Sequence, residues 1–571
     1  MSRVVLSVLL AAACATEPAP PSMPPGPAAP PNPPPGPPAA DNTVRPGTVD
    51  LDRQPPTDVV GVSAAASCSG CDVIVISLCS LRRDHVGAYG AIEGLTPSID
   101  RIAAEGVRFD SAYSASNFTL SALTAELTGR FGSSTGVLGW GKGLGTGVPT
   151  LPEVLGLYGY RTGAFTIDAA SGLRPDYGLD RGFQRMVVIA PPRDTPDGRH
   201  GTGEVGSGGA SAAPAVGWIA AQPADRPIFA LFHSRTAHFP FVITDEGTAE
   251  DPTGVLGALW AEGKGGTARV AMPGMAGGNA FGGLVGGGGD DATRLTRQAG
   301  TAGVAIWRRE YAKAVARMDR DVAALYAALE ARGRLDRTVI IVVADHGESL
   351  DDNGELLHGG SYFDDAVHVP LVVRVPGVRA GATDALVSQV DLLPTILELV
   401  GATPPATIDG VSMRPLLTDP SAVIRSTTLV EGGATSTVGG EPAGAVISPP
   451  WALLHQSFPC SRADMPEAGM VAPGAGAPPP PPPPPGSGHA GGHVLGPPVL
   501  YNCLFDIRAD PEQKRDVAAA NPEVVSGLLA RWQGYREAVA GRSVARELQL
   551  DPAFIELLRR TGYDFSQPPA R

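Results

Sequence analysis

Residues 338–348 read Thr-Val-Ile-Ile-Val-Val-Ala-Asp-His-Gly-Glu, and this stretch decides the fold class. An apolar run rich in β-branched residues is typical of a strand that is buried on both faces of a parallel sheet. The same pattern occurs at residues 72–78, which read Asp-Val-Ile-Val-Ile-Ser-Leu. Helical patterns lie between the two runs, and this alternation predicts an α/β fold with a mostly parallel central sheet.

Polar residues follow both apolar runs directly. Cys79 and Ser80 follow the first run, and Asp345 and His346 follow the second. Active groups in open parallel sheets gather at the carboxyl ends of the strands, so we expect these side chains to meet. The pattern further predicts strands at 161–166 and 227–233 and helices at 97–105, 119–128, 150–158, 304–332 and 391–400, with Thr150 as an N-cap.

The composition is that of a large folded body with low-complexity segments. Of the 571 residues 43% are hydrophobic, which supports a sizeable core, while Gly and Pro number 73 and 57. The long apolar segments exclude a fully disordered chain, and the absence of a Gly-X-Y repeat excludes collagen. The formal net charge is −14 without any Lys/Arg block, which argues against nucleic-acid partners.

The N-terminus predicts export. Residues 1–14 form an apolar run after Arg3 that is too short to span a bilayer and that ends at Cys14. The run resembles a lipoprotein signal in which Cys14 carries the lipid, and an ordinary signal peptide is the alternative. We therefore expect a protein of the cell envelope, in the periplasm or lipid-anchored to the outer membrane. The Pro-rich residues 15–66 would form a disordered linker.

The rest of the chain is predicted to form a catalytic domain at 67–420 and a C-terminal subdomain at 421–571. A Pro/Gly-rich insertion at 466–500 interrupts the second, and a Gly-rich insertion at 263–289 interrupts the first. Cys460 and Cys503 flank the Pro/Gly-rich insertion, and an exported chain permits a disulfide between them. Cys68 and Cys71 are spaced for either a tight disulfide or half of a metal site.

Four groups of short motifs follow one another along the chain. They are Leu-Arg-Arg-Asp-His at 81–85 with Thr-Pro-Ser-Ile-Asp at 96–100, Phe-Thr-Leu at 118–120 with Leu-Thr-Gly-Arg at 127–130, Ala-Asp-His-Gly-Glu at 344–348 with His-Gly at 358–359, and Val-Asp-Leu-Leu-Pro-Thr at 390–395 with Asp-Gly at 409–410. In this order they resemble the sulfatase family of the alkaline phosphatase superfamily. The resemblance implies an alkaline-phosphatase-like sandwich with a smaller C-terminal α+β subdomain. It also implies ester hydrolysis at a divalent metal, with the nucleophile at a helix N-terminus.

The resemblance places Thr119 at the nucleophile position. Classical sulfatases carry Cys-X-Pro-Ser-Arg there, whereas this chain reads Thr-Leu-Ser-Ala-Leu at 119–123. Oxidation of a secondary alcohol yields a ketone, so Thr119 cannot become the formylglycine aldehyde and no formylglycine is expected. A metal-activated threonine hydroxyl can still attack phosphorus or sulfur. The alternative is that Thr119 merely caps its helix.

The metal positions implied by the resemblance have also changed. Cys79 stands where relatives carry an aspartate ligand, Ser80 replaces a second aspartate, and Asp345 and His346 remain. A site made of Cys79, Asp345 and His346 suits zinc better than calcium or magnesium, because thiolate is a poor ligand for the hard ions. The alternative is that Cys79 is a small buried residue and that no metal binds.

Two histidines and an arginine complete the implied pocket. His238 matches a position that contacts the anionic group of the substrate, and His358 matches one that donates to the leaving oxygen. Arg130 follows the nucleophile helix and matches a pocket or structural position.

These residues predict a metal-assisted hydrolase of sulfate or phosphate esters, with phosphate favoured because formylglycine is excluded. The substrate would be a small-molecule, glycan or lipid ester. A second hypothesis is a surface lipoprotein that keeps the fold, has lost catalysis and binds an anionic ligand or a partner. A third is a transferase of phosphoryl or phospho-headgroups.

Overall fold

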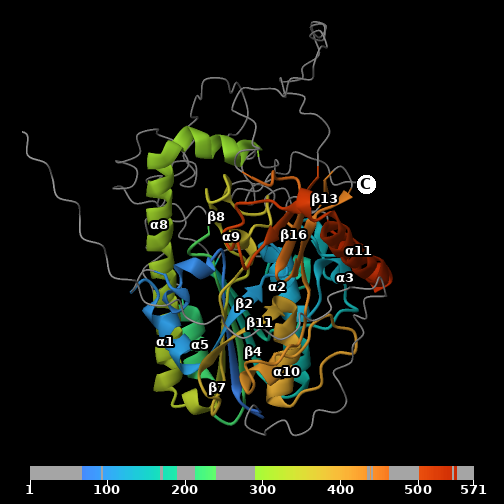
Figure 1. Ribbon diagram of the computed structural model, residues 1–571. Coiled ribbons are helices and arrows are strands. Elements are labelled where there is room, and N and C mark those ends of the chain that lie inside the picture. Colours follow the sequence, from blue (N-terminus) through green and yellow to red (C-terminus); the bar gives the residue numbers. More distant parts are fainter. Residues whose placement is uncertain are drawn as a thin grey trace, which may run out of the picture. The chain divides into compact units, whose positions relative to one another are not determined.

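A sheet of eight strands lies at the centre of the fold in the order β11-β2-β10-β7-β1-β6-β4-β5 (Figure 1). The strands are β1 (Asp72–Leu78), β2 (Val107–Tyr113), β4 (Arg161–Ile167), β5 (Arg185–Ile189), β6 (Ile228–Ser234), β7 (Thr338–Val343), β10 (Leu371–Arg374) and β11 (Gly381–Ser388). β1 pairs in parallel with both β6 and β7, whereas β10 runs antiparallel to β2 and β7. The α/β fold with a mostly parallel sheet, predicted from the sequence, is confirmed.

This computed structural model describes residues 67–91, 94–167, 172–189, 212–238, 290–433, 437–438, 441–461, 500–542 and 545–548. The predicted signal segment, the Pro-rich linker and most of both predicted insertions lie outside these residues. Within them, no helix has the length and apolar character needed to cross a membrane.

Strand β1 shows why its residues form a buried strand. Val73 and Val75 face one hydrophobic core, and Ile74 and Ile76 face another on the opposite side of the sheet. Successive side chains of a strand point to opposite faces, so a strand covered on both faces must be apolar at nearly every position. Burying each of these side chains contributes about 1.5–3 kcal/mol.

Helices cover both faces of the sheet. The helices on the Ile74 face are α1 (Pro97–Glu105), α5 (Ala213–Ala221) and α8 (Asp290–Ala331), and those on the Val73 face are α2 (Thr119–Thr128), α4 (Leu151–Leu157) and α10 (Leu392–Val400) (Figure 1). Thr150 caps α4 as predicted, because its hydroxyl accepts from the Glu153 amide in a capping box. Helix α8 begins at Asp290, earlier than the expected start at Val304.

A second, smaller sheet packs against helix α2. It is antiparallel, in the order β12-β15-β16-β17, and one hydrophobic cluster joins Leu453 of this sheet to Ala125 of α2 and to Trp532 of α11. These elements are β12 (Thr428–Glu431), β15 (Gly444–Ser448), β16 (Trp451–Gln456), β17 (Tyr501–Asp506) and α11 (Pro522–Val539). The predicted smaller α+β subdomain is therefore present as a sheet and a helix.

Several short elements complete the described chain. They are β3 (Lys142–Gly143), β8 (Ser349–Leu350), β9 (Leu356–Leu357), β13 (Thr437–Val438), β14 (Glu441–Pro442), β18 (Arg546–Glu547), α3 (Gly132–Thr135) and α9 (Asp364–Val367). The hairpin of β8 and β9 is important for the site, because its second strand is followed directly by His358.

The hairpin also buries the carboxyl group of Glu355. This residue is 3% exposed, and its backbone carbonyl accepts from the Asp351 amide at 2.7 Å. Burial disfavours the charged form and raises the pKa of Glu355 to about 8, although hydrogen bonds from Ser361 and Gly360 act in the opposite direction. Glu355 is therefore neutral at pH 7 in the folded protein.

The described residues contain two disulfides. Cys460 bonds to Cys503 of β17 across 43 residues of sequence, as expected for the pair around the Pro/Gly-rich insertion. Cys68 bonds to Cys71, which excludes the alternative of half a metal site. Among the described cysteines Cys79 alone is free, and it is buried.

The two disulfides should differ in their contribution to stability. Closing a loop of 43 residues restricts the unfolded chain by about 4 kcal/mol, and closing one of three residues by about 1.6 kcal/mol. We expect Cys460→Ser with Cys503→Ser to lower the thermal unfolding midpoint clearly more than the matched double variant Cys68→Ser with Cys71→Ser. Calorimetry of both double variants measures this, and equal midpoints would contradict it.

The buried Glu355 predicts a pH dependence of stability. The unfolded chain ionises this carboxyl near its ordinary pKa of 4.5, and the folded protein keeps it protonated up to about pH 8. The group therefore lowers the free energy of unfolding by about 1.4 kcal/mol per pH unit between these values. We expect Glu355→Gln to remove this decline, as measured by urea unfolding at pH 5, 6.5 and 8. An equal decline of the free energy of unfolding with pH in the variant and the wild type would refute this prediction.

Candidate active site

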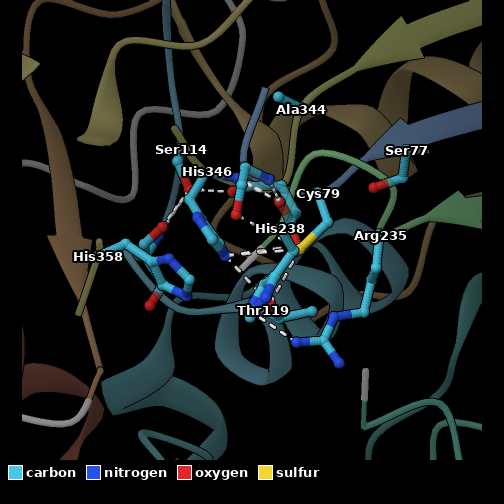
Figure 2. A network of polar contacts seen from close by, with 12 residues as sticks. Ser77, Cys79, Ser114, Thr119, Arg235, His238, Ala344, His346 and His358 are labelled. Atoms are coloured by element: carbon cyan, nitrogen blue, oxygen red, sulfur yellow. Dashed lines mark hydrogen bonds and ion pairs between the residues drawn. The ribbon is translucent and has the colours of Figure 1, made fainter. Parts of the chain in front are cut away.

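Four side chains from distant parts of the sequence meet at one edge of the central sheet. Figure 2 shows three of them, Cys79, Thr119 and His346. Cys79 follows β1, Asp345 and His346 follow β7, and Thr119 is the first residue of α2. Because β1 and β7 are adjacent and parallel, their carboxyl ends lie at the same edge. The meeting of these four residues, expected from the sequence, is what the structure shows.

The distances between their functional atoms are short. Thr119 Oγ1 lies 3.0 Å from His346 Nε2 and 3.4 Å from Cys79 Sγ. His346 Nε2 lies 3.9 Å from Cys79 Sγ and 3.7 Å from Asp345 Oδ2. All four residues are fully buried. The cluster is therefore a compact set of one hydroxyl, one thiol, one imidazole and one carboxylate.

Thr119 does not cap its helix. The N-cap of α2 is Phe118, which makes no side-chain capping bond, and Thr119 already belongs to the helix. Its hydroxyl is directed toward His346 and Cys79 instead (Figure 2). The alternative that Thr119 serves only as a cap is therefore wrong. The partly positive N-terminus of α2 faces the same cluster, which favours an anion there.

The orientation of His346 leaves Nε2 free to act as an acceptor. Nδ1 lies 2.8 Å from the Gly347 carbonyl and donates its hydrogen to it, so Nε2 carries the lone pair. Burial lowers the pKa of His346 to about 4, which keeps the ring neutral at pH 7. Gly347 is required here, because a Cβ at this position would lie 2.0 Å from the Asp365 carbonyl.

Hydrogen bonds hold both the carboxylate and the backbone carbonyl of Asp345. Its Oδ1 accepts from the amides of Ser80 and His346, at 3.1 and 2.7 Å. Its backbone carbonyl accepts from Ser114 Oγ at 2.5 Å and from Gln389 Nε2 at 2.7 Å. Burial alone would raise the pKa of Asp345, but the neighbouring His346 and a hydrogen bond from His233 outweigh it and hold the pKa well below its usual range. Asp345 is therefore a fixed negative charge.

Cys79 is a thiol in polar surroundings. Burial, followed by the charge of Asp345, raises the pKa of Cys79 well above its ordinary value. Its sulfur lies 3.9 Å from Ser80 Oγ, in addition to its contacts with Thr119 and His346. A cysteine that is inert filler normally packs among apolar groups, and this one faces three polar atoms.

His233 belongs to the cluster, and sequence reasoning missed it. It lies in β6, paired with Ser77 of β1, and its Nε2 lies 3.3 Å from Asp345 Oδ2. Within the described part of the chain, Cys79, His233 and Asp345 offer ligand atoms that all lie within 4.8 Å of one another. The available signal was a histidine near the carboxyl end of a predicted buried strand, but the order of strands in the sheet is not visible in the sequence.

His358 approaches the cluster from the β8–β9 hairpin. Its ring centre lies 4.2 Å from that of His346, and its Nδ1 lies 2.9 Å from Glu348 Oε1. Burial lowers the pKa of His358 to about 3 and raises that of Glu348 to about 8. At pH 7 the pair therefore shares one proton between Oε1 and Nδ1, and Nε2 carries a second. Nε2 has no hydrogen-bond partner among the residues that the structure describes.

His238 lies beside His358, with ring centres 4.8 Å apart. Its Nε2 accepts from Arg235 Nη2 at 2.7 Å, and both residues are buried. Arg235, which follows β6, adds a positive charge near Thr119 that sequence reasoning did not identify (Figure 2). The side of the cluster facing His238 is thus cationic.

Arg130 is not part of this site. It follows the C-terminal end of α2, and its Nη2 donates to Thr407 Oγ1. A helix of ten residues is about 15 Å long, so Arg130 and Thr119 lie at opposite ends of α2. The expectation of a catalytic Arg130 is corrected to a structural one, because its helix carries it away from the cluster.

The donor atoms of the cluster fit some metals better than others. Calcium and magnesium prefer several oxygen ligands, and the cluster offers a single carboxylate, with Ser80 beside it. A thiol, imidazoles and one carboxylate are ligands that zinc accepts. On donor chemistry the site fits zinc.

Comparison with known proteins agrees with the observed fold. The family model described as Sulfatase matches residues 72–402. The Delta 4,5-hexuronate-2-O-sulfatase of Bacteroides thetaiotaomicron is 24% identical over 380 residues, covering 60% of this chain and 71% of that protein.

Other relatives match over shorter stretches. The Extracellular sulfatase SULF-1 homolog of Drosophila melanogaster is 37% identical over 110 residues, which are 19% of this chain and 10% of that protein. The N-acetylglucosamine-6-O-sulfatase of Bacteroides thetaiotaomicron is 32% identical over 113 residues, 19% of this chain and 20% of that protein. The chain thus spans a tenth and a fifth of the length of these two relatives.

Two solved structures share the fold. One, described in complex with its substrate D-glucosamine-2-N,6-O-disulfate, has a TM-score of 0.57 at 16% identity and covers 83% of this chain and 99% of its own. The other is the phosphonate monoester hydrolase of Agrobacterium radiobacter, with a TM-score of 0.56 at 18% identity, covering 85% of this chain and 98% of its own. Since the family match runs from β1 to the end of α10 and covers more than half of the chain, this chain belongs to the sulfatase family.

Proposed function

We propose that this protein hydrolyses sulfate or phosphate esters with the Thr119 hydroxyl as its nucleophile. The observation that carries the proposal is the 3.0 Å contact between Thr119 Oγ1 and His346 Nε2. Because Nδ1 of His346 donates to Gly347, the hydrogen of the Thr119 hydroxyl points to Nε2. A lone pair of the hydroxyl oxygen is then left for attack on a bound ester.

The surroundings of Thr119 suit a tetrahedral anion. Arg235 carries a full positive charge, and the first turn of α2 offers backbone N–H groups. His358 presents an Nε2 hydrogen that has no partner within the described part of the chain. Preorganised donors of this kind stabilise the charge that develops on the transferred group. His358 would donate its Nε2 proton to the leaving oxygen while its Nδ1 takes the proton of Glu348. Water that releases the transferred group from Thr119 would then return a proton to Nε2.

A divalent metal would be held by Cys79, Asp345 and a histidine of the cluster. When bound, it would lower the pKa of a nearby hydroxyl and screen the charge of the ester. The protein residues themselves exclude water, since every member of the cluster is buried.

Phosphate esters are the favoured substrates. Threonine cannot supply the aldehyde hydrate of formylglycine-dependent sulfatases, whereas a hydroxyl nucleophile is sufficient for phosphoryl chemistry. The relatives named for sugar sulfates favour a glycan as the alcohol part of the ester. Glycan esters are therefore part of the proposed substrate class.

We further propose that the protein is exported and attached to a membrane through lipid on Cys14. The two disulfides support export, because disulfides persist in oxidising compartments outside the cytosol. Cys14 lies outside the described residues, and mass spectrometry of the mature N-terminus tests the attachment.

Substitutions of Thr119 test the nucleophile. We expect Thr119→Ala to lower kcat/KM for aryl phosphates and phosphodiesters by at least about 1,000-fold, and Thr119→Ser to retain much more activity. Thr119→Ser is the matched control, since it keeps the hydroxyl. Full activity in Thr119→Ala would exclude the proposed role. A wild type that turns over neither phosphate nor sulfate esters would instead favour the non-catalytic hypothesis.

The dependence on the leaving group tests His358. General acid catalysis contributes about 100- to 10,000-fold for poor leaving groups and little for activated ones. We expect His358→Gln to depress turnover of alkyl phosphates much more than that of 4-nitrophenyl phosphate. The control is His455→Gln in β16, outside the cluster. Equal losses on both substrates would mean that His358 does not donate to the leaving oxygen.

A further inference from the structure

Two histidines of the cluster, His233 and His346, are candidates for the same metal-ligand position. Both His233 and His346 lie near Asp345, and the sequence predicted that His346 binds the metal. Their distances to the Asp345 carboxylate distinguish them. His346 Nε2 is closest to Thr119 Oγ1, at 3.0 Å, and stands 3.7 Å from Asp345 Oδ2 and 3.9 Å from Cys79 Sγ.

His233 is closer to the carboxylate. Its Nε2 lies 3.3 Å from Asp345 Oδ2, and its ligand atom, that of Asp345 and Cys79 Sγ all lie within 4.8 Å of one another. A tetrahedral metal with bonds of about 2.0–2.3 Å holds its donor atoms about 3.3–3.6 Å apart. The nitrogen–oxygen distance at His233 matches this spacing, whereas the corresponding distance at His346, 3.7 Å, exceeds it.

The surroundings of His233 suit a metal ligand. It is fully buried, and its Nδ1 lies 3.3 Å from Thr166 Oγ1 of the neighbouring strand β4. Metal-binding histidines commonly hold their second ring nitrogen in a hydrogen bond that fixes the ring. His233, Cys79 and Asp345 also come from adjacent strands of one rigid sheet, β6, β1 and β7.

We propose that Cys79, His233 and Asp345 form a three-ligand zinc site, and that His346 lies outside the ligand set as the positioning partner of the Thr119 hydroxyl. Three protein ligands leave the fourth tetrahedral position open, which is the arrangement of catalytic rather than structural zinc sites. The inference rests on the proposed function for the purpose of the metal, but metal binding is measured without any turnover.

The experiment uses full-length protein stripped with a chelator and reloaded with zinc or cobalt(II). Zinc content is measured by mass spectrometry after equilibrium dialysis, and bound cobalt by its absorption spectrum. We expect about one metal per chain and a thiolate-to-cobalt charge-transfer band, which Cys79→Ser abolishes. His233→Gln should weaken zinc binding by more than about 100-fold, beyond the usual effect of losing an outer hydrogen bond.

The control variant is His346→Gln, which removes the neighbouring imidazole of the same cluster. We expect it to keep the zinc stoichiometry and the charge-transfer band. His233→Gly with added imidazole provides a second test, because free imidazole should fill the vacated position and restore the cobalt spectrum. This rescue separates a lost ligand from a variant that has failed to fold.

Several outcomes would overturn the inference. These are a wild type that binds no zinc, a cobalt spectrum without the thiolate band, preference for calcium or magnesium, or loss of zinc in His346→Gln but not in His233→Gln. Ester hydrolysis is assayed separately on the zinc-loaded samples. Protein that binds zinc as described but hydrolyses no ester would contradict the proposed function and leave the zinc site standing.

Discussion

The parallel pairing of β1 with β6 on one side and β7 on the other is the constraint on which the site depends. Ser77 of β1 pairs with His233 and with Val343, so Cys79 and Asp345 continue from the same edge of the sheet. Parallel strands end together, and their polar continuations have to meet. The apolar residues of β1 hold this register through two separate cores.

Burial determines the protonation states of the side chains at this edge of the sheet. Taking ionisable groups out of water is costly unless they are hydrogen-bonded or neutral. Asp345 keeps its charge because backbone amides and His233 donate to it. Glu348 is not compensated in this way and shares a proton with His358 instead. The site thus combines the fixed anion of Asp345 and the cation of Arg235 with neutral acceptors and donors around the Thr119 hydroxyl.

In this chain the family fold brings Thr119, Cys79 and Ser80 together at one site. The position of Thr119 is set by the N-terminus of α2, of which it is the first residue. Cys79 and Ser80 supply a thiol and a hydroxyl directly after the end of β1. A sheet edge therefore accepts new ligands readily, because the backbone that places them is fixed by packing elsewhere.

The sequence by itself determined the α/β class, the two central strands, the helix at Thr119 and the proximity of Cys79, Thr119, Asp345 and His346, since local hydrophobic period and motif order carry that information. Tertiary structure alone decided that His233 and Arg235 join the cluster, because their place depends on β6 lying beside β1. It also decided that Arg130 leaves the site at the far end of α2 and that Glu348 pairs with His358. Such contacts join residues that are distant in the chain, and no local pattern records which strands become neighbours.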